Sequence, residues 1–463
     1  MCWAWDELRT TRLGDPRLEL RLPKMVEDFS QHPEASCTEA LGKAGTKAAY
    51  RFWDNPRVNA EDVLAGHAAQ CVQRSLQYPV VLVAQDTSEI NLTHHPATTG
   101  TGYLGAPHCR GLLLHSLLAI SSTGVPLGVV RQFTWIRPVQ QLGKRHRRRK
   151  TALKDKESQR WLDGLTATAE RFTQHPHVVL MGDRESDLFD LFAASRPGHI
   201  DLLVRVCREK RRVEHPAKYL DAALQSEPVR GHVKVHIPAR ANRQERTATM
   251  AVRWHSLEIH APCHGPKRSS VRLTFILVEE IDPPQGEKPI RWLLATTLVV
   301  GSLQDALQYV QWYAYRWIIE RFHFVLKSGC KIEERQLETV ERMERAIPVF
   351  SIVAWRLLWL TLQARETPDV PCTVIFKEFE WKPLWIAAHP GTKRLPATPP
   401  TLREAVRMIA RLGGFLGRKC DGEPGPQTLW RGLRRLHDLA QGWWLATQRE
   451  EPPLPTMLAC GAT

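Results

Sequence analysis

Two short apolar runs, each followed within two residues by an aspartate, constrain the fold of this chain most strongly. Residues 80–84 (VVLVA) lead to Asp86, and residues 177–181 (HVVLM) lead to Asp183. Continuous apolar runs of this length predict strands that are buried on both faces. Between them, residues 115–120 and 127–135 have the pattern of two strands joined by a turn, and residues 158–172 that of a helix. This order predicts a mixed α/β domain.

The rest of the chain divides into a β-rich segment and helical regions. Residues 1–70 are polar with helical spacing, whereas residues 200–300 contain short alternating segments that predict strands. Helical spacing resumes at residue 303, and the chain after residue 370 is Pro-rich and then helical. We therefore expect a helical domain at 1–70, a central α/β domain at 71–370 with a β-rich insertion at about 200–300, and a helical domain at 371–463.

The chain carries 64 Lys and Arg residues against 49 Asp and Glu residues, a formal net charge of +15. Such an excess favours a polyanionic partner, with nucleic acid first and an anionic membrane surface second. No uninterrupted apolar run approaches about 18 residues and the N-terminus lacks a secretory pattern, so we expect neither a membrane span nor export. The ten cysteines form no CxxC pair, which argues against a disulfide framework or zinc ribbon and for a reducing cytoplasm.

Four polar residues with helical spacing stand out near residue 320. Tyr313, Arg316, Glu320 and Lys327 lie at relative positions 0, 3, 7 and 14. At about 100° per residue they span only roughly 60° of a helix surface. A carboxylate beside a tyrosine, an arginine and a lysine on one narrow face can bind a divalent metal and a phosphate.

The two strand-end aspartates provide partners for that carboxylate. Asp86, Asp183 and Glu320 can converge if the helix packs beside the two strands. Carboxylate oxygens suit Mg²⁺, and two such ions about 3.5–4 Å apart can stabilise an in-line displacement at phosphorus. The alternative is that the two aspartates only cap loops or helices, as most aspartates at strand ends do.

Together these residues resemble a known family, the DDE transposases of the IS4 group, particularly the Tn5 type. The four polar residues match its Y-x2-R-x3-E-x6-K signature at every position, and DTSEINL and MGDRESD resemble the blocks with its catalytic aspartates. The resemblance covers almost the whole chain, because further segments match the family's DNA-binding domain, β insertion and C-terminal block: LGDPRLELRL, TKAAYRFWDNP, EEIDPPQGEKPIRWLL and IARLGGFLGRKCDGEPGPQTLWRG.

The resemblance implies an RNase H-like (retroviral integrase-like) core in which Asp86, Asp183 and Glu320 bind two Mg²⁺ ions, for which Mn²⁺ substitutes. The implied activity is cut-and-paste transposition. Water nicks each transposon end, the new 3′-hydroxyl forms a hairpin that water reopens, and the 3′-hydroxyl then attacks target DNA. One site can serve every step because each is an in-line displacement that differs only in its nucleophile. The implied partners are double-stranded DNA and a second copy of the chain, in the bacterial cytoplasm at the nucleoid.

The resemblance also assigns DNA contacts around the acids. Tyr313, Arg316 and Lys327 would contact phosphates near the cut, and the alternative is a solvated helix face. Trp292, on an expected strand, would stack a base flipped from the duplex, and the alternative is a core tryptophan. Arg205 would reach the transferred strand, unless it only forms a salt bridge.

Other contacts would lie further from the acids. Lys47, Tyr50 and Arg51 have helical spacing and would recognise the terminal inverted repeat, unless they form a solvated face. The basic run at 144–150 (KRHRRRK) reads as a phosphate-contacting loop or as a solvated one. The apolar stripes of helices expected at 402–412 and 428–446 resemble the family's dimer-forming segment or fill an ordinary core.

Two other functions fit parts of this pattern. An RNase H-like nuclease or resolvase would cut DNA without hairpins or strand transfer. A DNA-binding repressor derived from a transposase would be expected to lack one of the three acids or the N-terminal domain. This chain has all three acids and the N-terminal domain.

Overall fold

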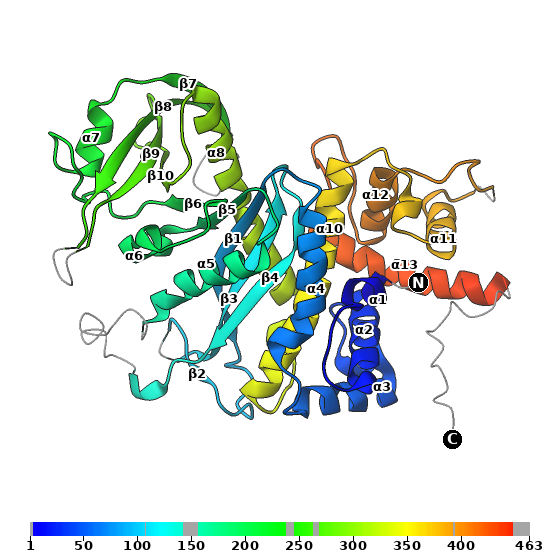
Figure 1. Cartoon of the computed structure of the whole chain (residues 1–463). Coiled ribbons are helices and arrows are strands. Elements are labelled where there is room, and N and C mark those ends of the chain that lie inside the picture. Colours follow the sequence, from blue (N-terminus) through cyan, green and yellow to red (C-terminus); the bar gives the residue numbers. More distant parts are fainter. Residues whose placement is uncertain are drawn as a thin grey trace.

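One ten-stranded mixed sheet runs through the protein, with helices on both faces (Figure 1). The computed structural model describes residues 3–106, 108–141, 156–237, 245–262, 268–391 and 394–447. The strand order is β2-β3-β1-β5-β6-β10-β9-β8-β7, and β4 pairs with the outer side of β3. The expected mixed α/β fold is therefore confirmed.

The first half of the sheet contains the expected strands. They are β1 (Val81–Asn91), β2 (Gly102–Tyr103), β3 (Arg110–Ser121), β4 (Pro126–Trp135), β5 (Val178–Gly182) and β6 (Ile200–Arg205). β1, β3 and β4 form an antiparallel meander, whereas β1, β5 and β6 are parallel. The expectation that the first strand ends before Asp86 is wrong. Pairing with β3 continues to Asn91, so Asp86 lies inside β1, just beyond its last pair with β5.

The second half of the sheet is the expected β-rich segment. It comprises α7 (Leu220–Ser226), β7 (Gly231–Ile237), β8 (Arg246–Ile259), β9 (Val271–Glu280) and β10 (Arg291–Thr296). Its antiparallel strands extend the central sheet, because β10 pairs with β6. This pairing joins the insertion to the strands that follow Asp183.

The sheet separates two helical layers. Alternate residues of β1 point to opposite faces. Leu82 and Ala84 pack in the core that also contains residues of the later helices, while Val81 and Val83 pack with α5 (Arg160–Arg171) and α6 (Phe189–Ala193). The side of β1 to which a residue points therefore decides which helical layer it meets.

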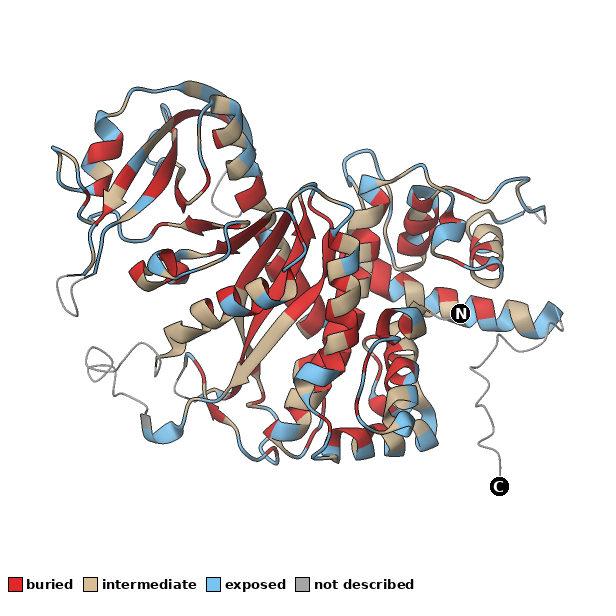
Figure 2. Cartoon of the chain, in the orientation of Figure 1, coloured by how far each residue is buried: buried red, intermediate tan, exposed pale blue. Residues whose placement is uncertain are grey.

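Four helices precede the sheet: α1 (Trp3–Leu8), α2 (Pro16–Gln31), α3 (Cys37–Asp54) and α4 (Ala60–Ser75). α3 is kinked at Gly42, whose φ of 66° is a conformation that suits glycine. The long helix α10 (Val340–Glu366) packs against α2, α4 and β4. By length and composition α10 could cross a membrane, but 78% of its apolar window is buried within the fold, as in the core helix of a globular domain (Figure 2).

The C-terminal helices are α11 (Glu378–Ala388), α12 (Leu402–Leu412) and α13 (Pro426–Thr447). They form a separate apolar core with the end of α10, so the helices expected at 402–412 and 428–446 are both present. The apolar stripe of α12, with Leu402, Val406 and Ile409, is buried inside this core. That stripe therefore fills an intramolecular core, while the far end of α13 exposes Leu439 and Leu445.

Candidate active site

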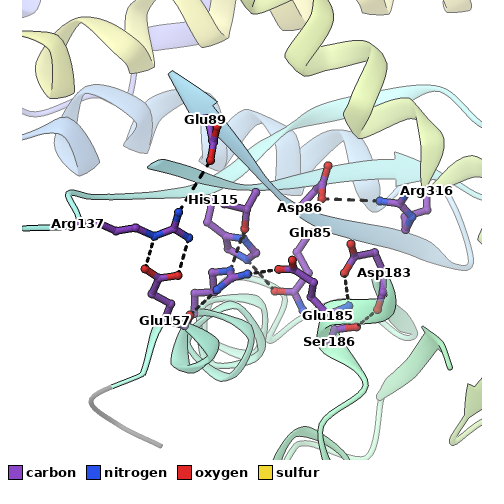
Figure 3. Close-up of polar contacts among 12 residues, drawn as sticks. Gln85, Asp86, Glu89, His115, Arg137, Glu157, Asp183, Glu185, Ser186 and Arg316 are labelled. Carbon is purple, nitrogen blue, oxygen red and sulfur yellow. Dashed lines mark hydrogen bonds and ion pairs between the residues drawn. The ribbon is translucent and has the colours of Figure 1, made fainter. Parts of the chain in front are cut away.

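The parallel pairing of β1 with β5 places the two aspartates side by side. Ala84 is opposite Met181 at the last pair, and each aspartate follows two residues later on the same face. Figure 3 shows Asp86 and Asp183 next to each other at this edge of the pairing. Asp183 also caps the short turn after β5, since its Oδ1 accepts a hydrogen bond of 2.8 Å from the Glu185 amide. The capping alternative is thus realised for Asp183, and it leaves Oδ2 for another partner.

The third carboxylate arrives from the helices that pack beside β1. Glu320 lies on α9 (Trp317–Phe324), which follows α8 (Leu303–Tyr315) with Arg316 at the junction. The Arg316 guanidinium forms an ion pair with Glu320, and its Nη1 lies 4.0 Å from Asp86 Oδ1. Arg316 is only 9% exposed and links Glu320 to Asp86; Figure 3 shows its contact with Asp86.

The three acids form a site with excess negative charge. The pKa of Asp86 is raised to about 7, chiefly by burial; Arg316 opposes this rise, and the charges of Asp183 and Glu320 add to it. Among the described side chains, no group of three or more His, Cys, Asp or Glu residues is arranged tightly enough to hold a metal ion. Glu320 instead faces Arg316. The candidate ligands are all carboxylates, and the Arg316 guanidinium is the cation beside them. Such a set fits a divalent ion that prefers oxygen ligands, provided that the Glu320 side chain turns away from Arg316.

The expected single helix for the four polar residues is wrong in two places. The α-helical hydrogen bonding is interrupted at Arg316, and a π-helical turn at Val325–Gly329 follows α9. A π-turn contains more residues than an α-turn, so it rotates Lys327 away from the α-helical stripe. Lys327 Nζ lies 3.3 Å from Glu333 Oε1, which also accepts a bond from the Asn91 amide at the end of β1. Lys327 is thus held at the end of β1 by its contact with Glu333.

Tyr313, Trp292 and Arg205 form one aromatic cluster next to the acids. The Tyr313 and Trp292 rings meet edge to face with centroids 5.9 Å apart, and the Arg205 guanidinium lies 5.4 Å from the Trp292 centroid. Trp292 lies on β10, as expected, and is only half-buried, whereas Tyr313 is buried. Arg205 ends β6 and donates to the Arg291 carbonyl over 3.1 Å. Burial raises the pKa of Tyr313 to about 12, so its hydroxyl keeps its proton and can donate.

The residues expected to recognise transposon ends divide into two kinds. Lys47 and Arg51 are exposed on α3, one helical turn apart. Tyr50 instead packs edge to face on Trp53 and donates its hydroxyl to the Gln336 carbonyl over 3.5 Å. The basic run at 144–150 lies outside the described residues.

Several residues at the site gave no sequence signal of their own. The loop after Asp183 carries acids at alternate positions, and each has a different partner: Glu185 pairs with Arg160, and buried Asp187 pairs with Arg211. Asp187 also accepts bonds from the amides of Cys207 and Arg208, just after β6. In the sequence, only the D-x-E-x-D spacing of Asp183, Glu185 and Asp187 pointed to these residues.

Three family models match the chain in succession. The transposase DNA-binding model matches residues 1–58, the transposase DDE domain model residues 143–350, and the transposase Tn5 dimerisation domain model residues 352–451. The chain belongs to the Tn5-like DDE transposases of the IS4 family. The sheet of this transposase is accordingly an RNase H-like core. DDE transposases are metal-dependent enzymes that cut and join DNA, and the matched regions on either side provide DNA binding and dimerisation.

The match to the DDE domain includes Asp183 and Glu320, and Asp86 precedes the matched residues. The pairing of β1 with β5 nevertheless places Asp86 beside Asp183 in the transposase. The dimerisation match spans the end of α10 through α13, so it includes both the buried stripe of α12 and the exposed end of α13.

Proposed function

We propose that this transposase moves its element by cut-and-paste chemistry at the site of Asp86, Asp183 and Glu320. It would nick each transposon end, form and reopen a hairpin, and join the 3′ ends to target DNA. The proposal rests on two contacts: Arg316 joins Glu320 of α9 to Asp86 of β1, and the pairing of β1 with β5 sets Asp183 beside Asp86. The division of labour would follow the domains: end binding at 1–70, catalysis at 71–370 with the insertion at 200–300, and dimerisation at 371–463.

The three acids would hold two Mg²⁺ ions, with Mn²⁺ as a substitute. The ions would supply positive charge to the attacking and leaving oxygens of an in-line displacement at phosphorus. For Glu320 to bind an ion, its contact with Arg316 has to break. The released Arg316 guanidinium then has a natural new partner in the DNA phosphate, to which it can donate two parallel bonds.

The aromatic cluster beside the acids would hold the strained hairpin. The half-buried ring of Trp292 would stack on the flipped base. The Arg205 guanidinium would leave its contact with the Trp292 ring and bind the transferred strand. The buried Tyr313 would orient Trp292 and donate its hydroxyl to a phosphate. Lys327, which is held at the end of β1, would contact DNA phosphates further from the cut.

End recognition would rest on exposed Lys47 and Arg51 of α3 and on the run at 144–150, with Tyr50 supporting α3 through its packing on Trp53. A homodimer would hold both ends, each cut by the subunit whose partner recognises it. The net charge of +15 would favour binding to DNA, and we expect the protein at the nucleoid in the bacterial cytoplasm and not on a membrane. A hydrolytic nuclease or a repressor remains the alternative, and the acids together with Trp292 favour transposition.

A cleavage assay on the element's own end sequence with Mg²⁺ tests this function. Asp86→Ala, Asp183→Ala and Glu320→Ala should each lower cutting by more than about a hundredfold, since even outer-shell changes at metal sites cost about 10–100-fold. Specific binding to the end should stay within about twofold. Asp62→Ala on the exposed side of α4 is the control and should cut normally. Near wild-type cutting by any acid variant would remove that acid from the site, and cutting without hairpins or joined products would favour the nuclease.

A further inference from the structure

Arg160, the first residue of α5, lies on the face of β1 opposite Glu320 and contacts both β1 and the turn that follows β5. Its Nε donates to Thr87 Oγ1 over 2.8 Å, and its Nη2 forms an ion pair of 2.5 Å with Glu185 Oε2. Its Nη1 donates to the Glu157 carbonyl over 2.7 Å. The Arg160 side chain is only 11% exposed, and its guanidinium lies 5.6 Å from the Trp135 ring centroid and 5.2 Å from that of Trp161. These contacts fix the guanidinium in one place.

On the β1 side, Arg160 starts a directed chain of hydrogen bonds. A guanidinium can only donate, so the Thr87 hydroxyl accepts from Arg160 and gives its own proton to His115 Nδ1, 2.9 Å away. His115 must then carry its proton on Nε2, which donates to Gln85 Oε1 over 3.2 Å. Gln85 and Thr87 flank Asp86, and alternation along the strand points them to the opposite face. The chain therefore holds the backbone on both sides of Asp86.

On the β5 side, Arg160 acts through Glu185. The Glu185 amide donates to Asp183 Oδ1, and the Glu185 carboxylate binds Arg160. Glu185 thus connects Asp183 to the Arg160 guanidinium, because its backbone amide binds the first and its side-chain carboxylate binds the second. Figure 3 shows Glu185 between the loop of Asp183 and the network beside β1. Both aspartates are consequently tied to one side chain that contacts neither of them.

We propose that Arg160 is a positioning residue that sets the separation of Asp86 and Asp183 and thereby the affinity of the site for its metal ions. This inference rests on the proposed function of the acids. Arg160 holds Asp86 through Thr87 and Asp183 through Glu185, so its loss lets the two carboxylates move independently. Outer-shell residues of this kind alter metal affinity because they orient the ligands.

Direct binding of Mn²⁺, followed by electron paramagnetic resonance on the full chain, tests the inference. Arg160→Ala should weaken Mn²⁺ binding by about 10–100-fold, and the Mn²⁺ concentration for half-maximal cleavage should rise in parallel. Affinity for end DNA should not change. Arg171→Ala removes a guanidinium from the last turn of the same helix and should leave Mn²⁺ binding as in the wild type.

Glu185→Gln guards against a variant that fails to fold, because the Glu185 side chain is 67% exposed. Glu185→Gln should also weaken Mn²⁺ binding. Combining it with Arg160→Ala should weaken binding little further, since both variants break the same Arg160–Glu185 ion pair. Lower cleavage with unchanged Mn²⁺ affinity in both variants would overturn the positioning role. So would a fully additive double variant.

The failure of this inference is distinguishable from the failure of the proposed function. Asp183→Asn should abolish the same Mn²⁺ binding in the wild-type background. If it does and the wild type still cuts no DNA, the proposed function falls while the Arg160 comparison stands. If Asp183→Asn leaves Mn²⁺ binding intact, the metal site is elsewhere and the positioning role falls with it.

Discussion

At the residue level, Arg316 joins two of the three acids, Glu320 and Asp86. It pairs with Glu320 and lies 4.0 Å from Asp86, yet its buried Nη1 makes no hydrogen bond among the described residues. A buried donor without an acceptor is costly. A DNA phosphate beside the acids would satisfy this donor, so we expect Arg316 to link metal binding to DNA binding.

The half-buried ring of Trp292 lies next to the acids and Tyr313. If this ring stacks the flipped base, Trp292→Ala should lower hairpin formation by roughly 1–3 kcal/mol, or about 5- to 160-fold, and affect the first nick much less. Trp292→Phe should be intermediate. Trp254→Ala is a matched control, because Trp254 also lies on a strand beneath an arginine guanidinium, at 5.1 Å. Time courses that resolve nicked and hairpin products provide the measurement, and equal losses at both steps would rule out the stacking role.

At the scale of elements, the turn after β5 decides where Asp183 points. The Ser186 hydroxyl donates to the Asp183 carbonyl over 2.7 Å, and Gly182 lies directly beneath it. A Cβ added at Gly182 would lie 2.1 Å from Ser186 Oγ and 2.6 Å from Ser186 Cβ. The absence of a side chain at residue 182 therefore lets the turn close over the end of β5.

Gly182→Ala should move the Asp183 turn without unfolding the sheet. Overpacking of this kind costs about 1–3 kcal/mol. A displacement of about 1 Å at a catalytic group can lower the rate about a hundredfold, so cleavage should fall far more than stability. Gly198→Ala is the control, since a Cβ there meets nothing within 4 Å. Comparable cleavage by both variants in the end-cutting assay would contradict the role of the turn.

The docking of α1 onto α4 provides a second prediction at this scale. Glu7 accepts bonds from His67 Nδ1 at 2.6 Å and from Arg74 at 2.7 and 2.8 Å. Burial alone would raise the pKa of Glu7, but these bonds outweigh it and lower the pKa from 4.5 to about 2. Because the folded pKa is depressed, the stabilisation is complete above about pH 5 and is lost as the pH falls toward 2.

Glu7→Gln should therefore lower the free energy of unfolding by about 3 kcal/mol at pH 7. The difference from the wild type should shrink to less than half by pH 3. Urea unfolding at both pH values measures it, with Asp6→Asn, an exposed neighbour, as control. A difference that does not depend on pH would show that the Glu7 charge is not responsible.

Residue patterns predicted elements well where burial alone determines them. The strands before Asp86 and Asp183, the meander and the helix at 402–412 follow from apolar periodicity. The continuation of β1 to Asn91 could not be predicted, because it depends on pairing with β3. The same holds for the π-turn that moves Lys327 and for the Arg160 network, whose members are up to about a hundred residues apart.

At the scale of the whole molecule, one buried arginine joins the DNA-binding region to the catalytic helices. Arg335 donates to the carbonyls of Ala35 and Pro33 before α3, and to the carbonyl of Cys330 after α9. Arg345 of α10 donates to the carbonyls of Trp53 and Val58 at the end of α3. The region matched by the DNA-binding model is thus fastened to the segment that carries Glu320.

We propose that Asp86, Asp183 and Glu320 bind the same metal ions. Anomalous scattering from Mn²⁺ in crystals of the transposase bound to its end DNA tests it most directly. We predict manganese peaks with oxygens of all three carboxylates at about 2 Å, and the Glu320 side chain turned away from Arg316. Manganese bound without Asp86 or Asp183, or Glu320 still paired with Arg316 in the metal-loaded complex, would contradict it.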